Sequence, residues 1–348
     1  MPATSIRDLV IKDDDIVVGT HGRSFWILDD ITPLRQLSSQ LTNASAILYK
    51  PQNTFRVRWN MNTDTPIPQE EPSGQNPPDG AIINYYLNEK ASAVSLEILD
   101  DKGTLIRKYS NRDTLYKIPN VNIPPYWIRP QEILSANAGS HRFLWDMHYT
   151  PLNVPASYPI AAIYMNTAPN ETSPWVLPGM YTAKLTVDEK IFSQSFEIKM
   201  DPRVKVSTDE LARIRDLAYL CYDGRKRCMD VLNKITSLHE QVKNILPKAG
   251  IKLVKQLNRL DSLLVLIENP QPGSLTRGFN KMNNDFAGLF NIVNDSEMPP
   301  TTQITGAAAK ARSELELLLI KWMELRQIEV TRVNVNLTLA GLPLLSAK

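Results

Sequence analysis

The chain has 348 residues, with 39 Lys and Arg against 37 Asp and Glu and a formal net charge of +2. Its length predicts two or three domains of about 100–200 residues each, and its near-neutral charge gives no electrostatic reason to bind nucleic acid or an anionic membrane. No apolar run approaches the roughly 18–20 residues that span a bilayer, and the first residues lack the apolar core of a secretory signal peptide.

Three short β-rich runs open the chain, separated by turn-like residues at 12–14 and 19–22. This pattern predicts the last strands of a β-propeller blade in residues 1–35. A single blade cannot bury its own two faces and needs neighbouring blades stacked on both sides. Because only seven residues precede Asp8, we expect the missing upstream propeller blades to be partners of this chain.

Residues 36–80 are predicted to cross over to the next domain. Within them, 55–59 alternates with period two, which predicts a strand with two arginines on one face and three apolar residues on the other. The stretch 60–80 is dense in proline, which cannot donate to a β-ladder. It is either a flexible linker or an ordered crossover, and we expect the second because Trp59 and Met61 offer apolar anchors.

Residues 81–205 are predicted to form an immunoglobulin-like or fibronectin type III-like β-sandwich, because short alternating strands follow one another with frequent turns. An enlarged loop, 110–138, is rich in proline and aromatic residues. The predicted hairpins pair 94–100 with 104–109 and 179–187 with 192–200.

Residues 206–348 are predicted to form an antiparallel helical bundle. Cys221 and Cys228 lie seven positions apart in the first helix and are interpreted as small core residues. The apolar tail 339–345 is expected to dock back onto the bundle. The predicted helices run from 207 to 246, from 252 to 267, from 275 to 293 and from 307 to 330.

The run Gly19–Ile31, Gly-Thr-His-Gly-Arg-Ser-Phe-Trp-Ile-Leu-Asp-Asp-Ile, carries a family resemblance. It is similar to the end of the propeller in bacterial BNR-repeat proteins, which are described as glycosyl-hydrolase-like or sortilin-like. The resemblance covers roughly residues 6–205 and implies a secreted or periplasmic parent protein. Further blocks that fit it are 58–66, 74–83, 124–127, 141–146 and 177–181.

His21 and Arg23 lie in this tight motif, between and after two glycines. At a propeller surface they would contact an anionic or sugar ligand. Alternatively, they belong to a hairpin whose polar groups satisfy the backbone between blades.

The sequence contains no residues to which we assign a catalytic or metal-binding role. Asp29 and Asp30 resemble a carboxylate pair, but adjacent strand residues point to opposite faces, which favours a cap or turn role. Asp146 and His148 would share a face of a regular strand and His141 would not, so the three lack the ligands of a metal site. No cofactor motif is present.

Tyr126 and Trp127 follow two prolines in the enlarged loop and are the predicted binding aromatics. Trp127 has an alternative role as a plug of the sandwich end.

The sequence therefore predicts a multidomain α+β chain: a propeller blade remnant, a crossover, a sandwich and a helical bundle. Its predicted function is that of a non-catalytic C-terminal accessory region of an extracytoplasmic propeller protein, which is structural or binds a protein or glycan. The alternative is a part of a carbohydrate-active hydrolase whose active site lies mainly on the missing propeller.

Overall fold

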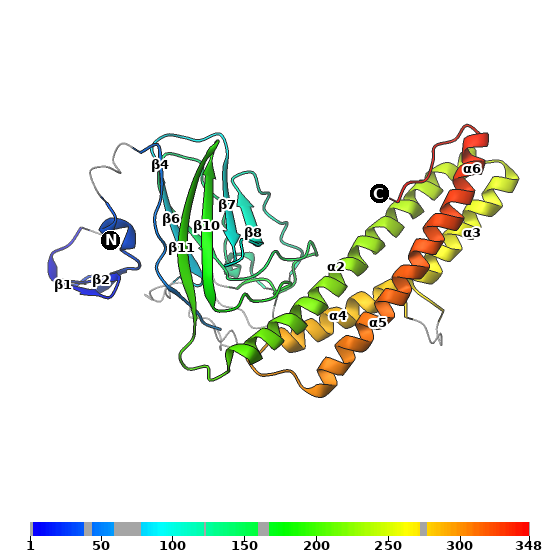
Figure 1. Ribbon diagram of the computed structural model, residues 1–348. Coiled ribbons are helices and arrows are strands. Elements are labelled where there is room, and N and C mark those ends of the chain that lie inside the picture. The colour runs from blue at the N-terminus through cyan, green and yellow to red at the C-terminus, as the bar shows by residue number, and fades with distance from the viewer. Residues whose placement is uncertain are drawn as a thin grey trace. The chain divides into compact units, whose positions relative to one another are not determined.

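A computed structural model describes residues 3–37, 44–58, 78–121, 123–158, 167–271 and 277–347. The chain is a mixed α+β protein with several β-sheets and a C-terminal helical region (Figure 1). It divides into two compact units, Met1–Lys205 and Val206–Lys348. The described strands all belong to the first unit.

An antiparallel sheet of three strands lies at the start of the first unit. Its strands are β1 (Ile6–Lys12), β2 (Asp15–Thr20) and β3 (Phe25–Leu28), and we call it the N-terminal sheet. Asp13 at a φ of 54° and Gly22 at 71° occupy the two turns, where the left-handed region suits Gly and tolerates Asp. The three predicted strands and their turns are confirmed.

Two larger sheets complete the first unit, and we call them together the β-core. Apart from the parallel pair β5–β11, neighbouring strands are antiparallel. In spatial order the five-stranded sheet comprises β5 (Thr54–Arg56), β11 (Lys190–Met200), β10 (Gly179–Val187), β7 (Val94–Leu99) and β8 (Leu105–Ser110). The three-stranded sheet comprises β4 (Ala46–Leu48), β6 (Ala81–Leu87) and β9 (Gly139–Trp145).

Side chains from both sheets of the β-core fill one hydrophobic core. Trp145 of β9 is fully buried, and its ring meets those of Tyr181 and Phe196 edge to face at 5.6 and 6.3 Å. The predicted hairpins β7–β8 and β10–β11 are confirmed by their antiparallel registers. Alternate side chains of β7 and β10 point inward, so period two in the sequence builds their side of the core, whereas β6 is buried along most of its length.

Part of the predicted crossover 36–80 contributes to the β-core. Residues 44–58 supply β4 to the three-stranded sheet and β5 to the five-stranded sheet. Upstream, the short helix α1 (Thr32–Arg35) carries Pro33 in its first turn. The proposed anchors Trp59 and Met61 lie outside the described residues.

The second unit is helical. Its first helix begins with a capping box, in which Ser207 Oγ accepts from the Glu210 N–H and Glu210 accepts from the Ser207 N–H. The 3-10 helix η3 (Leu246–Lys248), which contains Pro247, follows α2. The main helices are α2 (Thr208–Ile245), α3 (Ile251–Glu268), α4 (Phe279–Asn294), α5 (Thr302–Glu324) and α6 (Thr331–Leu339), with the π-helical turn η4 (Leu325–Val330) between the last two.

The predicted last helix, 307–330, was too short at both ends. α5 begins at Thr302 because Thr301 caps it, accepting from the Ile304 N–H. Beyond residue 330 the weak helix formers continue as α6, where buried Val333 and Leu337 pack inward. Packing therefore overrides local propensity in this segment.

Small residues and the apolar tail hold the helices together. A Cβ on Gly224 of α2 would lie 2.5 Å from the ring of Phe286 on α4, so these helices pack at close range. The Gln241 amide exchanges two hydrogen bonds with the main chain of Ser346, at 2.9 and 2.8 Å. Buried Leu345 thus lies against the helices. In the described chain, no helix is both long and apolar enough for a bilayer.

Candidate functional site

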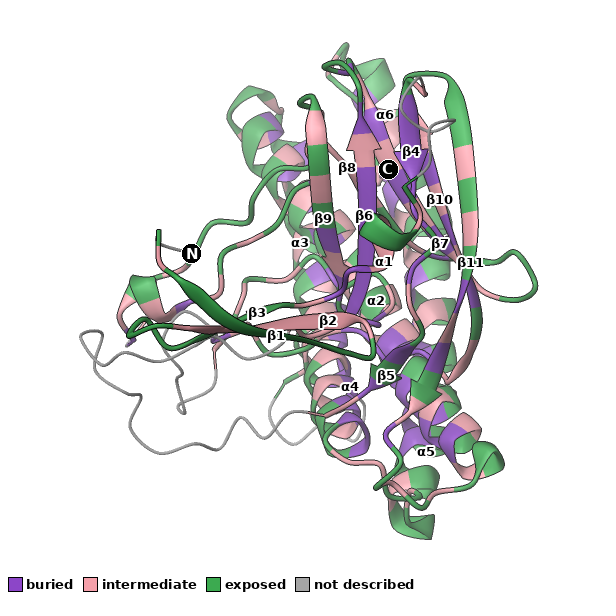
Figure 2. Ribbon diagram, turned by 90° about the vertical axis from the view of Figure 1, so that its left-hand side faces the viewer, coloured by how far each residue is buried: buried purple, intermediate pink, exposed green. Residues whose placement is uncertain are grey.

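The N-terminal sheet exposes apolar side chains on both of its faces. Directly paired residues share a face, so the registers sort the side chains into two sets. Figure 2 shows β1 exposed along its length, whereas β6 of the β-core is buried along most of its length. One face carries Ile6, Leu9, Ile11, Ile16, Val18, Trp26 and Leu28, and the other carries Val10, Val17, Phe25 and Ile27 beside Asp8, Lys12 and Asp15.

The degree of exposure is unusual for such side chains. Phe25 is 77% exposed, Ile27 60% and Ile11 56%. Apolar runs that fill both faces of a strand are typical of sheets covered on both sides. Large contiguous apolar patches on a surface mark interaction sites. The N-terminal sheet therefore has the apolar composition of a sheet that is buried on both faces, although its side chains are exposed to solvent.

A polar network attaches this sheet to the β-core. Asp30 is buried, and its Oδ2 accepts a hydrogen bond of 2.6 Å from Asn84 Nδ2 on β6. Arg142 of β9 donates to the main-chain oxygens of Asp29 and Asp30 at 2.8 and 3.1 Å. The Asp30 N–H donates in turn to Asp15 Oδ1 at 2.9 Å. We call Asp30, Asn84 and Arg142 the latch.

The side-chain hydrogen bonds of Asp30 bear on its predicted cap or turn role. Asp30 Oδ1 accepts from both the N–H and the hydroxyl of Thr32, at 3.1 and 2.5 Å, which is the predicted turn role. Burial, followed by the charge of Asp15, raises the pKa of Asp29. Sequence reasoning missed Asn84 and Arg142 as partners. The sequence signal that could have indicated this contact is Asn84, because an amide in the middle of the apolar run 81–87 needs a hydrogen-bond partner when it is buried.

His21 and Arg23 lie in the exposed turn between β2 and β3. Their contacts with the rest of the described chain use main-chain atoms: His21 N donates to Ser5 O at 2.9 Å, and Arg23 O accepts from Trp26 Nε1 at 2.9 Å. Both side chains are available to a ligand. The cavity that Tyr126 lines in the enlarged loop includes neither His21 nor Arg23 among its lining residues.

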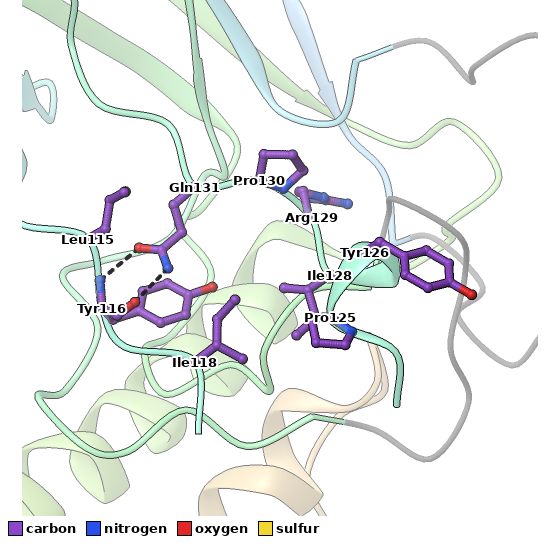
Figure 3. Close-up of a pocket in the computed structure, with 9 residues that line it drawn as sticks. All are labelled: Leu115, Tyr116, Ile118, Pro125, Tyr126, Ile128, Arg129, Pro130 and Gln131. Carbon is purple, nitrogen blue, oxygen red and sulfur yellow. Dashed lines mark hydrogen bonds between the residues drawn. The ribbon is translucent and has the colours of Figure 1, made fainter. Parts of the chain in front are cut away.

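The enlarged loop 110–138 contains a cavity of about 590 Å³ (Figure 3). Its volume is within the range of small-ligand pockets, roughly 300–1,000 Å³. Most of the lining is apolar, and Figure 3 shows Tyr116 and Ile118 across from Pro125 and Ile128. The lining residues are Leu115, Tyr116, Ile118, Pro125, Tyr126, Ile128, Arg129, Pro130 and Gln131.

Hydrogen bonds fix the walls of this cavity. The Gln131 amide donates to Tyr116 O at 3.0 Å and accepts from Tyr116 N at 2.9 Å, which holds the two lining segments together. Arg129 N donates to Thr167 O at 2.8 Å, and Thr167 N donates to Trp127 O at 3.0 Å. A cavity with walls held in this way is largely preformed, which lowers the entropy lost on binding.

The two predicted aromatics have different environments. Tyr126, in the 3-10 helix η2 (Pro125–Trp127), is 56% exposed and lines the cavity. Trp127 is partly buried and packs on a small apolar cluster with Ile123 and Ile128. Tyr126 is therefore the accessible member of the pair, whereas the side chain of Trp127 packs within the loop on this apolar cluster.

A polar cluster around one buried histidine lies just past the end of β9. His148 is 5% exposed, its ring centroid is 4.0 Å from that of Trp175, and its Nε2 is 3.1 Å from Glu171 Oε2. Arg107 of β8 donates from Nη1 to both oxygens of Asp146 at 2.7 Å. Sequence reasoning considered His148 but missed Glu171, which is distant along the chain. Among the described residues, no group of His, Cys, Asp and Glu has the arrangement of a metal site.

Comparison with known proteins does not identify a family. No family model matches the chain, and no curated protein matches it. Among solved structures, it has a match to CopC from Methylosinus trichosporium OB3b, with 12% sequence identity over 36% of this chain and 80% of that one. The TM-score is 0.17, so this match carries no argument about fold or function.

Proposed function

We propose that this chain is a non-catalytic accessory region of an extracytoplasmic β-propeller protein, in which the N-terminal sheet packs between two further β-sheets. The observation that carries the proposal is the exposure of apolar side chains on both faces of that sheet. Burying apolar surface contributes about 25 cal/mol per Å². Two partner sheets are needed, since one partner leaves one face in water.

The resemblance of Gly19–Ile31 to the last blade of BNR-repeat proteins supports the identity of these partners as propeller blades. In this proposal the latch joins the blade to the β-core, which is an immunoglobulin-like or fibronectin type III-like sandwich. Residues 206–348 are an antiparallel bundle. The β-core would then hold a fixed orientation to the propeller blade.

Hydrogen–deuterium exchange on the purified chain tests the proposal. We expect the amides of 16–28 to exchange much faster than those of 180–198, because an uncovered three-stranded sheet opens easily whereas the β10–β11 hairpin belongs to a buried core. Two matched variants provide a second test. Ile27→Lys should leave the melting temperature unchanged, whereas Ile198→Lys should lower it strongly. Equal and strong protection of both segments in a monomer would refute the need for partner sheets.

The cavity of the enlarged loop supports a second candidate function, binding of a protein or glycan. Four residues with exposed apolar side chains, Leu115, Tyr116, Ile118 and Tyr126, line it. Isolated exposed apolar residues are ordinary, whereas a group around a preformed cavity is typical of a binding site.

Two substitutions in the loop separate binding from stability. Tyr126→Ala should abolish binding to a glycan array or a peptide library without changing the melting temperature. Trp127→Ala should destabilise the loop, because its indole packs on the cluster behind the cavity. Tyr219→Ala, an exposed tyrosine of α2, is the control. Retained binding by Tyr126→Ala would refute this site, and an array without any bound ligand would refute the candidate function.

A further inference from the structure

We propose that His148, in its positively charged form, holds the segment 171–176 against the end of the β-core through its ion pair with Glu171. We call this ion pair the clasp, and we propose that it releases the segment as the pH rises. The inference is independent of the proposed propeller role. It concerns a buried group for which neither candidate function has a use.

The two ring nitrogens of His148 face two oxygens: Nδ1 is hydrogen-bonded to one, and Nε2 lies within ion-pair distance of the other without making a hydrogen bond to it. Nδ1 lies 2.7 Å from the main-chain oxygen of Asp146, and Nε2 lies 3.1 Å from Glu171 Oε2. Both oxygens can only accept a hydrogen, and a neutral imidazole has only one N–H. A neutral His148 would therefore turn a nitrogen lone pair toward one of the two oxygens. The contacts fit the imidazolium.

Charged groups from two other parts of the first unit also face this site. From β5 and the residues after it, the guanidinium carbons of Arg56 and Arg58 lie 5.8 and 5.2 Å from the Trp175 ring centroid, on which His148 also packs. From β8, Arg107 neutralises Asp146, and its guanidinium lies over the ring of Tyr109. The cations favour a neutral imidazole, so the carboxylate of Glu171 is the group that holds the charge on His148.

The balance of these effects favours the charged form. Burial lowers the pKa of His148, but the charge of Glu171, with a smaller contribution from Asp146, more than offsets burial and raises the pKa above 6.5. When folding raises the pKa of a histidine, protonation of that histidine stabilises the folded state. This stabilisation is complete when the pH is below the pKa of the histidine in the unfolded chain. That stabilisation is lost as the pH rises through the folded value. The clasp is therefore closed in acid and opens toward alkaline pH.

The segment held by the clasp is defined by its main-chain contacts. Tyr149 N donates to Pro174 O at 3.1 Å, and Val176 N donates to Met147 O at 2.9 Å, on either side of His148. Arg56 of β5 donates to Val176 O at 2.6 Å. Loosening of 171–176 would therefore weaken the attachment of β5 and expose the indole of Trp175.

The test is an NMR titration of the full chain, with the His148 resonances assigned from His148→Gln. We expect both ring nitrogens of His148 to be protonated at pH 6. We also expect protection of the Val176 amide, corrected for the intrinsic pH dependence of exchange, to fall about tenfold for each pH unit between the unfolded and folded pKa values. His21→Gln is the matched control, because His21 is exposed, and it should retain this dependence.

Glu171→Gln provides a second variant that keeps the shape of the partner. It should lower the pH at which His148 titrates, because the negative charge is gone. A neutral His148 ring at pH 6 in the wild-type chain would overturn the proposal. So would protection of Val176 that does not change between pH 6 and 9, or an unchanged titration in Glu171→Gln.

Discussion

The latch makes a quantitative prediction about the attachment of the N-terminal sheet. Asp30→Gly removes the carboxylate that accepts from Asn84 Nδ2 at 2.6 Å. Glycine suits the φ of 56° at this position, so the substitution introduces no backbone strain. A hydrogen bond to a charged acceptor contributes about 1.5–3 kcal/mol, and a buried donor left without its partner costs about 1–3 kcal/mol.

We therefore expect Asp30→Gly to weaken the attachment by about 3 kcal/mol, which is roughly a hundredfold in the opening equilibrium. The assay is hydrogen exchange at the Ile31 amide, which donates to Asp14 O at 2.7 Å next to the latch. Asp29→Gly is the matched control, because Arg142 contacts only the main-chain oxygen of Asp29. Its effect should remain below about 1 kcal/mol, the entropic cost of glycine. Equal effects of the two variants would refute the role of the carboxylate.

Three further predictions concern the rest of the chain. Gly224→Ala should destabilise the helical unit by about 1–2 kcal/mol in chemical denaturation, since overpacking against Phe286 outweighs the helix propensity of Ala. A variant that is more stable than the wild type would show that the Phe286 ring moves aside to accommodate the methyl group. Burial raises the pKa of Cys221 and Cys228 to about 12, so both thiols should resist iodoacetamide at pH 8 until the unit unfolds; rapid labelling of the native chain would contradict this. A glycosidase, esterase and peptidase screen should detect no turnover, whereas turnover that Asp29→Asn abolishes would support the hydrolase alternative.

The local sequence pattern predicted the two hairpins. Contacts with residues distant along the chain determined features that the local pattern could not predict. The turns at 100–103 and 188–190 fix their own strands, and both hairpins formed as expected. The predicted strand 55–59 is shorter in the structure, where β5 is Thr54–Arg56; Phe55 and Arg56 point to opposite faces as expected, but Arg56 is buried while Phe55 is half exposed. Which face points inward depends on Val176 O, the acceptor of Arg56, 120 residues away along the chain.

The candidate sites show the same division. Proline and aromatic density pointed to the loop around Tyr126, because those residue types are visible in one short segment. The pairing of His148 with Glu171 and of Asp30 with Asn84 joins single polar residues from separate elements. A lone polar residue in the sequence indicates neither its partner nor its charge state, so these contacts required the structure.

The parallel pairing of β5 with β11 has a consequence for synthesis of the protein. Thr54 pairs with Ile198, so roughly 140 residues must leave the ribosome before β5 has its partner. At about 5–20 residues per second, this delay is on the order of ten seconds. During that time β5 is an unpaired strand, because its neighbour β11 has not yet been synthesised, and unpaired strands are prone to aggregation. Translation speed, as well as sequence, should thus affect the yield of the folded protein.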